Sequence, residues 1–386
     1  MTRVPSARRR PTILIATDTW EQVNGITTLY RAVLATIDRE FSGQCRLIIV
    51  YPAKQPAQER YESGHLCLGI VPRLRFRVPQ YPELFTGYFS NAQLSAVERL
   101  HGRADVIHLP TQGLVGFSVG RYAKRHARPC VGFYHTEWPN YVTAYLPAWI
   151  PSRPRRDLGR TIAGAVDRLV YGACSSVVVH STRSVASLPK TLRTSVVTAP
   201  EFADVVRFAG ESPMSTTDHE EITFGYVGRL AREKGLDRIV SQARFISERG
   251  GRLLVVGDGP ERNRLGANPH AQFEGWQRGH ALRACYQQMT YLLMPADSDT
   301  LGLVLFEAGA AGVPAVALRG TVAADCIQRH ESGVVVDDFS QPVLTRLMSL
   351  AGTPTFQRMR ARAMNMARAH DVAIGTSKLL EMWGCH

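Results

Sequence analysis

Two cations flank a short loop in the second half of the sequence, within Gly225–Asp237. A run of residues typical of a buried strand ends at Gly228, and Arg229 and Lys234 follow it before a helix that we expect to open at Gly235. Two cations beside the free backbone N–H groups of a helix start form a site suited to a diphosphate. A solvated loop with surface charges has the same composition, so this segment needs support from its neighbours.

A glycine-rich turn follows the next predicted strand, within Leu253–Arg264. The turn reads Gly257, Asp258, Gly259 and Pro260. It lets a ligand or another backbone segment approach closely, because glycine has no side chain to block the approach. The turn lacks the six-residue glycine pattern of dinucleotide-binding proteins, so it is weak evidence for a nucleotide by itself.

Two acidic side chains, Asp299 and Glu307, stand on either side of a predicted helix start at Gly302 and Leu303. The first amides of such a helix can face a sugar or phosphate. Asp299 can then accept hydrogen bonds from sugar hydroxyls, and Glu307 from the vicinal hydroxyls of a ribose. The structural alternative is a capping Asp and a surface Glu. The neighbours of Glu307 are almost all apolar, however, so its carboxylate would be buried unless a ligand meets it.

Together, these three segments resemble the C-terminal domain of the retaining family 4 glycosyltransferases, which have the GT-B fold. The resemblance covers most of residues 222–336 and is closest to the branch that forms sulfoquinovosyl-, mannosyl- and glucosyl-diacylglycerol lipids. It implies that two cations bind the donor diphosphate, Glu307 the ribose, Asp299 the donor sugar, and the backbone near Trp276 the base. The family more often has Glu where this chain has Asp299, which leaves the donor sugar open. The implied donor-binding residues are Gly25, Gly228, Arg229, Lys234, Gly275, Trp276, Asp299, Gly302, Leu303 and Glu307.

The first half of the chain is similar to the same branch more loosely. Thr17–Ile26 resembles its opening strand and glycine loop, where Gly25 would let the donor phosphate approach the backbone. His135 follows a predicted strand and resembles the family's histidine beside the transferred sugar. A lone histidine is more often structural, but its place at the end of a strand favours a role in the site. Asp204 lies where the family has a Gly-Val-Asp turn; the glycine is absent, so we do not assign Asp204 to the site.

The resemblance implies transfer with retention of configuration, the acceptor attacking on the face that the diphosphate leaves. Arg229 and Lys234 would stabilise the charge that grows on the leaving group, so neither a metal nor another cofactor is expected. His135 would hydrogen-bond the sugar as positive charge develops, and the acceptor's proton would pass to a donor phosphate oxygen. The expected catalytic residues are His135, Arg229, Lys234 and Asp299.

Short apolar runs alternate with helical stretches along the chain, a pattern that predicts parallel sheets covered by helices. The polar segment Gly210–Glu221 indicates a linker. We therefore expect an α/β protein of two Rossmann-like, doubly wound domains that face a central cleft. Their predicted bounds are 1–208 for the acceptor-binding domain and 209–370 for the nucleotide-sugar-binding domain, with a C-terminal helix in 371–386 packing back on the first. Helical spacing of Leu158, Ile162, Val166 and Leu169 predicts a core-facing stripe.

The composition is that of a globular protein, with 386 residues, 45% hydrophobic and 20% charged. The seven cysteines are scattered and contain no C-x-x-C pair, so neither a disulfide framework nor a zinc site is expected, and a reducing cytosol is favoured. Arg8–Arg10 and the apolar run after them resemble the start of a signal peptide, but Asp18 interrupts that run. No stretch approaches the roughly 20 apolar residues that span a bilayer.

The net charge of +13 lies entirely in the first half of the chain. Residues 1–200 hold 26 Lys and Arg against 12 Asp and Glu, whereas residues 201–386 hold 20 against 21. Arg73, Arg75 and Arg77 alternate with apolar residues, and Arg153–Arg160 follow Trp149. We expect this half to dock on an anionic membrane, as a peripheral protein on the inner face of the cell membrane. In the alternative, these arginines pair with carboxylates within the fold.

The predicted function is transfer of a hexose from a nucleotide-diphosphate sugar, with UDP favoured, to a membrane lipid of the diacylglycerol type. The same chemistry on a soluble, polysaccharide or lipid-linked oligosaccharide acceptor stays open as an alternative. A nucleic-acid-binding protein is a remote alternative suggested by the pI near 9.7. No helix-turn-helix, zinc or RNA-binding signature supports it, so no nucleic-acid partner is expected.

Overall fold

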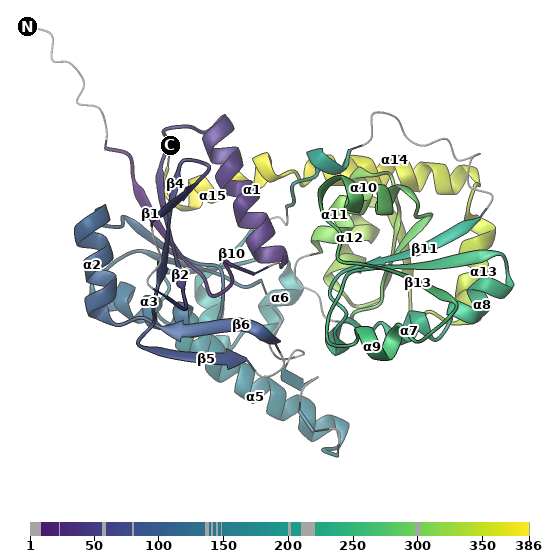
Figure 1. The fold of residues 1–386 in the computed structure, drawn as a ribbon, viewed down its shortest axis with the longest axis horizontal. Coiled ribbons are helices and arrows are strands. Elements are labelled where there is room, and N and C mark those ends of the chain that lie inside the picture. Colours follow the sequence, from purple (N-terminus) through teal and green to yellow (C-terminus); the bar gives the residue numbers. More distant parts are fainter. Residues whose placement is uncertain are drawn as a thin grey trace, which may run out of the picture. The chain divides into compact units, whose positions relative to one another are not determined.

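The chain forms two compact units, each built on its own sheet (Figure 1). The computed structural model describes residues 9–385 except 23, 56–58, 79–80, 136–138, 140–141, 144–145, 148, 200–201, 210–220 and 298–301. For residues 77–78, 81–85 and 194 it describes the backbone but not the side chains. Unit 1 comprises Met1–His135, Arg160–Pro200 and Gly375–His386, and unit 2 comprises Thr136–Gly159 and Glu201–Ile374.

Unit 1 contains an eight-stranded sheet in the order β10-β9-β8-β7-β1-β2-β4-β3. All neighbouring strands are parallel except β3 and β4. The central strands are buried on both faces, which explains their continuous Val, Ile and Leu runs. The strands are β1 (Thr12–Ala16), β2 (Arg46–Pro52), β3 (Arg60–Glu62), β4 (His65–Ile70), β7 (Val106–Leu109), β8 (Cys130–Phe133), β9 (Ser176–Val179) and β10 (Val196–Thr198).

A separate antiparallel hairpin accompanies this sheet, and the described residues also form α-helices around it. The hairpin consists of β5 (Leu74–Val78) and β6 (Tyr81–Tyr88). Asn24 caps the first helix, because its side-chain oxygen accepts a hydrogen bond from the Thr27 N–H at 2.9 Å. The helices are α1 (Gly25–Glu40), α2 (Asn91–His101), α3 (Leu114–Arg125), α5 (Ser152–Tyr171), α6 (Thr182–Ser187) and α15 (Val372–Met382), of which α5 and α15 run across the unit boundaries.

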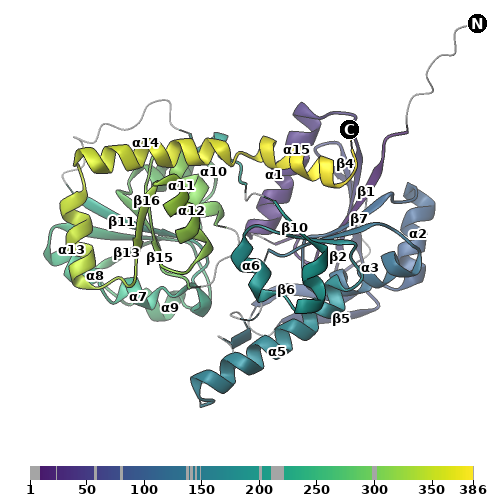
Figure 2. The same ribbon diagram turned by 180° about the vertical axis from the view of Figure 1, so that it is seen from behind.

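Unit 2 contains a six-stranded, wholly parallel sheet in the order β13-β12-β11-β14-β15-β16. Counted from β11 along the chain, this is the doubly wound order 3-2-1-4-5-6. Helices α7 to α9 lie on one face of the sheet and α10 to α12 on the other (Figures 1 and 2). The strands are β11 (Ile222–Val227), β12 (Gly251–Val256), β13 (Ala271–Gly275), β14 (Tyr291–Met294), β15 (Ala315–Leu318) and β16 (Gly333–Val336). The helices are α7 (Asp237–Val240), α8 (Ala243–Glu248), α9 (Arg262–Leu265), α10 (Gly279–Gln287), α11 (Leu303–Ala310), α12 (Val322–His330), α13 (Gln341–Leu350) and α14 (Pro354–Ala369).

The prediction of two doubly wound parallel sheets is confirmed. The strands that the sequence did not reveal are β3 to β6 and β13. β3 and β13 lie at sheet edges and carry polar side chains, so they lack the continuous apolar run that marked the others. β4 holds His65 and Gly69 within its apolar residues, which obscured its pattern.

Of the apolar stripe predicted on α5, Val166 packs against the core, and the other three residues do not. Leu158, Ile162 and Leu169 are 42%, 39% and 59% exposed, whereas Ala163 and Val170 are buried. The core-facing interpretation was wrong for these three residues, because helical spacing shows which residues share a face and does not show which face is covered. The same helix therefore presents apolar side chains to solvent.

Within the described part of the chain, no helix combines the length and the hydropathy that a membrane span requires.

Candidate functional site

The sheet of unit 2 has its topological switch point between β11 and β14. These two strands are neighbours, and the chain leaves them toward opposite faces of the sheet; in open α/β sheets, ligands bind at the carboxyl ends of such a strand pair. The loop after β11 carries Gly228, Arg229 and Lys234, and the segment after β14 leads to α11. Both cationic side chains are half-buried. The predicted donor-binding segments thus converge on one edge of the sheet.

The glycine-rich turn after β12 packs directly against the loop after β11. A Cβ atom at Gly257 would lie 1.9 Å from the Gly228 carbonyl oxygen, and one at Gly259 would lie 2.5 Å from the Leu230 carbonyl oxygen. The Leu230 N–H donates to the Asp258 carbonyl at 2.9 Å, and the Gly257 N–H to the Gly275 carbonyl at 2.7 Å. The turn therefore uses its glycines for contact between backbones, one of the two uses that the sequence allowed.

The segment around Gly235, where we expected a helix to begin, has a different backbone structure. Lys234 ends a single 3-10 turn that begins at Arg232, and Gly235 closes it with φ +65°; α7 begins only at Asp237 and has four residues. The prediction of a helix start at Gly235 was wrong, because the glycine serves as a C-cap and not as the first helical residue. Anion binding at this loop therefore depends on the two cationic side chains more than on a helix dipole.

The same loop is fastened to the end of β14. A Cβ atom at Gly235 would lie 2.6 Å from the Pro295 carbonyl oxygen. Arg238 donates to that carbonyl at 2.6 Å and pairs with the Asp297 carboxylate at 2.6 Å. Lys234 is therefore held beside the strand that leads to the predicted sugar-binding segment.

Glu307 is buried within α11, as its apolar neighbours predicted, and is 7% exposed. Its Oε2 accepts a hydrogen bond from the Tyr286 hydroxyl at 2.8 Å, and its Oε1 lies 3.8 Å from the Arg207 guanidinium. Burial raises the pKa of Glu307, whereas Tyr286 and Arg207 favour the ionised form and Asp204 opposes it. The carboxylate keeps acceptor capacity beyond these two partners, which suits it to hydroxyl groups of a ligand.

The surroundings of Glu307 include residues that sequence reasoning did not assign to the site. Arg207 lies over the Phe208 ring at 4.9 Å, and Phe208 packs edge-to-face on Tyr286. Arg207 also pairs with Asp204 at 3.5 Å. The only sequence signal for Arg207 was its place just after the divergent turn that contains Asp204.

The remaining donor residues predicted in the second half of the chain lie at the same edge of the unit 2 sheet or outside the described residues. Gly275 ends β13 with φ +68°, and the adjacent Trp276 is 41% exposed, so its indole is available to stack on a base. Gly302 precedes α11 without a side-chain cap, and Leu303 is its first residue. Asp299 lies outside the described residues.

In unit 1 the corresponding switch point lies between β1 and β7. Gly25 is the first residue of α1 after β1, and its backbone is exposed. Asp18 is buried beside it and accepts hydrogen bonds from the Thr111 hydroxyl at 3.0 Å and the Val115 N–H at 3.3 Å. This carboxylate joins the end of β1 to the first turn of α3, so it organises the edge that presents Gly25.

His135 follows β8 at this edge and is buried in a chain of hydrogen bonds. Its Nδ1 lies 3.1 Å from His180 Nε2, and its Nε2 lies 3.4 Å from the Tyr30 hydroxyl. Tyr30 is also 2.5 Å from His108 Nε2, and the Trp383 indole donates to His108 Nδ1 at 3.4 Å. Burial lowers the pKa of His108 to about 3, and burial with the neighbouring histidines lowers the pKa of His135.

The direction of these hydrogen bonds follows from the Trp383 indole, because an indole N–H can only donate. His108 accepts at Nδ1, so its proton is on Nε2 and is donated to Tyr30. Tyr30 then donates to Nε2 of His135, whose proton is on Nδ1 and is donated to His180. His135 is therefore a neutral imidazole with a defined tautomer.

Comparisons with known proteins show which proteins the chain resembles. Residues 221–350 match the sequence model of the family described as Glycosyl transferases group 1. The chain is 29% identical over 333 residues to a GDP-mannose-dependent alpha-mannosyltransferase of Mycobacterium tuberculosis, covering 84% of this chain and 82% of that protein. It is 29% identical to the sulfoquinovosyl transferase SQD2 of Arabidopsis thaliana, over 60% of this chain and 46% of that protein. It is 25% identical to the alpha-monoglucosyldiacylglycerol synthase of Streptococcus pneumoniae, over 78% and 69%.

Solved structures share the fold at lower identity. The sucrose-phosphate synthase of Thermosynechococcus elongatus superposes with a TM-score of 0.72 at 17% identity, covering 97% of this chain and 99% of that one. The lipopolysaccharide-biosynthesis glycosyltransferase WaaG superposes with a TM-score of 0.64 at 16% identity, covering 96% and 99%. The predicted GT-B fold is confirmed.

Proposed function

We propose that this chain is a glycosyltransferase of the group 1 type, which moves a hexose from a nucleotide-diphosphate sugar to a membrane lipid acceptor with retention of configuration. The observation that carries the proposal is the edge of the unit 2 sheet. There the switch point brings the loop with Arg229 and Lys234 beside the segment that leads to Glu307. A site with two cations and a buried ribose-binding carboxylate suits a nucleoside diphosphate.

In the proposed reaction, the cations Arg229 and Lys234 act on the leaving group. As the bond between sugar and phosphate breaks, negative charge grows on the diphosphate, and Arg229 and Lys234 stabilise that charge. The acceptor attacks on the face that the diphosphate leaves, and its proton passes to a phosphate oxygen. In this proposal the step uses no metal ion and no other cofactor, so added Mg²⁺ or Mn²⁺ leaves the rate unchanged.

His135 contributes as a neutral imidazole, whose two ring nitrogens are held by His180 and Tyr30. Positive charge develops at the anomeric carbon during transfer, and a neutral imidazole beside it avoids the repulsion that an imidazolium would bring. The lowered pKa of His135 supports this role at neutral pH. We assign recognition of the sugar hydroxyls to Asp299.

The donor and acceptor are the finer parts of the proposal. A UDP-linked donor stays our prediction, and the mannosyltransferase relative adds GDP-mannose as a second candidate. For the acceptor, the similarity to an alpha-monoglucosyldiacylglycerol synthase supports a lipid. The exposed side chains Leu74 and Phe76 on β5, and the exposed stripe on α5, support docking on a membrane, with the protein peripheral on its inner face.

A donor and acceptor screen tests the proposal. The purified full-length protein is incubated with UDP-glucose, UDP-sulfoquinovose or GDP-mannose and with a crude lipid extract, and products are identified by mass spectrometry. We expect one donor to yield a new glycolipid, and NMR of its anomeric proton to show the donor's configuration. An inverted product contradicts retention, and transfer only to water-soluble acceptors favours the soluble-acceptor alternative.

A further inference from the structure

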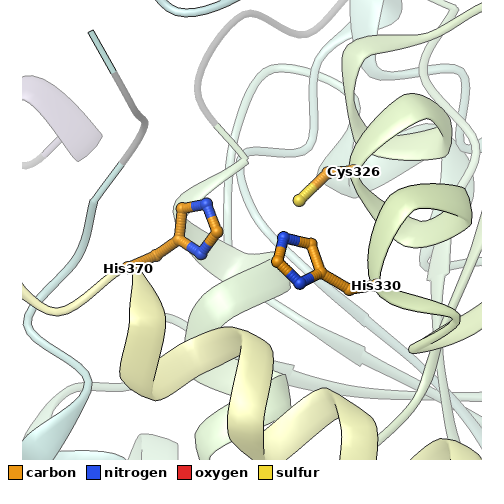
Figure 3. Close-up of side chains that lie close together, drawn as sticks. All are labelled: Cys326, His330 and His370. Carbon is orange, nitrogen blue, oxygen red and sulfur yellow. The ribbon is translucent and has the colours of Figure 1, made fainter.

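Three side chains that the proposed reaction does not use converge in unit 2. Cys326 and His330 lie on α12, and His370 caps the end of α14; one ligand atom from each lies within 4.8 Å of the other two. Figure 3 shows the thiol and both imidazole rings turned toward one another. Cys326 and His330 are four positions apart, which places them on one face of the helix.

The protonation of His370 leaves a ligand atom available. Its Nδ1 lies 2.9 Å from the Met366 carbonyl oxygen, which can only accept a hydrogen bond, so the proton is on Nδ1. In the neutral ring, Nε2 then carries a lone pair. Burial is the largest influence on both rings and lowers the pKa of His330 and of His370. Neutral imidazole is the form that binds metals.

The sulfur atoms of the cluster indicate which class of metal fits. Cys326 Sγ lies 3.8 Å from Met366 Sδ, so a thiol and a thioether stand beside the two rings. Thiolate and imidazole select thiophilic transition metals and not Mg²⁺ or Ca²⁺. Zinc bonds of about 2.3 Å to sulfur and about 2.0 Å to nitrogen place tetrahedral ligands about 3.5 Å apart. The side chains would therefore close by roughly 1 Å, which rotamer adjustment can supply.

We propose that Cys326, His330 and His370 bind a thiophilic transition-metal ion, for which Zn²⁺ is the best fit. The ion takes the Cys326 thiolate and two imidazole nitrogens, with the thiol proton released to solvent as it binds. It joins α12 to the end of α14.

This site has a structural role behind the candidate donor site. His370 stacks on Phe306 at 4.6 Å between ring centroids, and Phe306 directly precedes Glu307 on α11. The His370 carbonyl also accepts a hydrogen bond from the Ala203 N–H at 2.9 Å, in the segment that leads to Arg207. A metal at His370 thus fixes a residue that contacts both the helix of Glu307 and the segment of Arg207. It takes no part in the transfer step.

Metal content of the tag-free, full-length protein tests the site. The protein is stripped with a chelator, dialysed against Zn²⁺ and analysed by mass spectrometry. We expect one ion per chain for the wild type, and loss of that ion in Cys326→Ser, His330→Ala and His370→Ala. Cys285→Ser and His280→Ala, a buried cysteine and an exposed histidine of the same unit, are matched controls that retain it.

Two further readouts separate metal binding from a folding defect. Co²⁺ should give a thiolate charge-transfer absorption in the wild type that Cys326→Ser lacks, and Zn²⁺ should raise the unfolding temperature of the wild type but not that of His330→Ala. Before Zn²⁺ is added, His330→Ala should melt close to the stripped wild type. Zinc content in the wild type no higher than in Cys326→Ser, or Co²⁺ bound without the thiolate absorption, overturns the proposal. These measurements do not depend on transferase activity, so they are independent of the proposed function.

Discussion

Arg229 and Lys234 are the residues through which the chain is proposed to meet the leaving diphosphate. Changing either to Ala should lower kcat/KM at least about tenfold with the fold intact, because a charge-assisted contact in the transition state is lost. Arg232→Ala is the matched control, since Arg232 is an exposed cation in the same 3-10 turn as Lys234. Turnover near the wild-type value in both Arg229→Ala and Lys234→Ala would contradict the proposal that these residues bind the donor diphosphate.

Glu307 and Asp299 should separate nucleotide binding from sugar transfer. Glu307→Ala should weaken binding of UDP or GDP about tenfold or more, because hydrogen bonds to a charged group are lost. Asp299→Ala should leave free nucleotide binding unchanged and reduce transfer, since its partner is the sugar. Calorimetry with each nucleotide measures the first effect, and equal affinities in the two variants would contradict this division of roles.

The ionisation of Glu307 adds a pH dependence to the same measurement. Burial raises its pKa in the free protein, and ribose hydroxyls donate to the ionised form, so bound nucleotide favours the carboxylate. Acidification from neutral pH should therefore weaken nucleotide binding, and Glu307→Ala should lack this component of the pH dependence.

At the scale of elements, the site depends on two loops whose backbones touch. Gly257→Ala should lower the free energy of unfolding by more than about 2 kcal/mol, because its Cβ would meet the Gly228 carbonyl and its φ is +135°. Gly250→Ala is the matched control, with φ +73° and nothing within 4 Å of the added Cβ, and should cost only about 1 kcal/mol. Urea unfolding measures the free energy of unfolding of both variants. Equal losses of stability would show that the positive φ of each glycine, and not contact between the loops, decides how much stability is lost.

The end of α15 reaches the histidine chain of unit 1 through the Trp383 indole. Trp383→Phe keeps an aromatic ring but removes the donor to His108, so the tautomers of His108 and His135 lose their fixed direction. We expect kcat to fall about fivefold, for the loss of about 1 kcal/mol, with nucleotide affinity unchanged. Nitrogen-15 NMR of the histidine rings should show mixed tautomers, and unaltered tautomers in the variant would refute this role.

At the scale of the whole molecule, the excess of positive charge in the first half predicts salt-sensitive membrane attachment. The side chains of Leu74, Arg75 and Phe76 on β5 are exposed, and so is Trp149, at 82%. Phe89, just after β6, is 1% exposed and packs in the core of unit 1, so it is not part of this surface. Each cation near an anionic surface contributes on the order of 1 kcal/mol, so a few suffice for reversible binding.

Co-sedimentation with vesicles measures this attachment. Binding should require anionic lipid, weaken as salt is raised, and fall when Arg73, Arg75 and Arg77 are changed together to Ser. The control variant changes three cations of α3 to Ser with the same loss of charge, namely Arg121, Lys124 and Arg125, and should bind nearly as well as the wild type. Equal losses in the two variants would indicate attraction by net charge alone, and no binding at low salt would favour a soluble acceptor.

The sequence by itself predicted the strands of the unit 2 sheet other than β13, and the burial of Glu307. Buried parallel strands are continuous apolar runs, so the runs that form β11, β14 and β15 are recognisable as strands in the sequence. A carboxylate among apolar neighbours predicted the burial of Glu307. These features are local, and their physical causes act within a few residues of chain.

Only the tertiary structure decided which distant groups meet. It brought Arg207 and Tyr286 to Glu307, and Trp383 to His108, across separations that no local pattern records. It exposed the apolar stripe of α5, because spacing defines a face but not what covers it. The Cys326 and His330 spacing was visible in the sequence as one turn of helix. The third member, His370, joins them only because α14 ends against α12, so the scattered cysteines did not by themselves predict the proposed metal site.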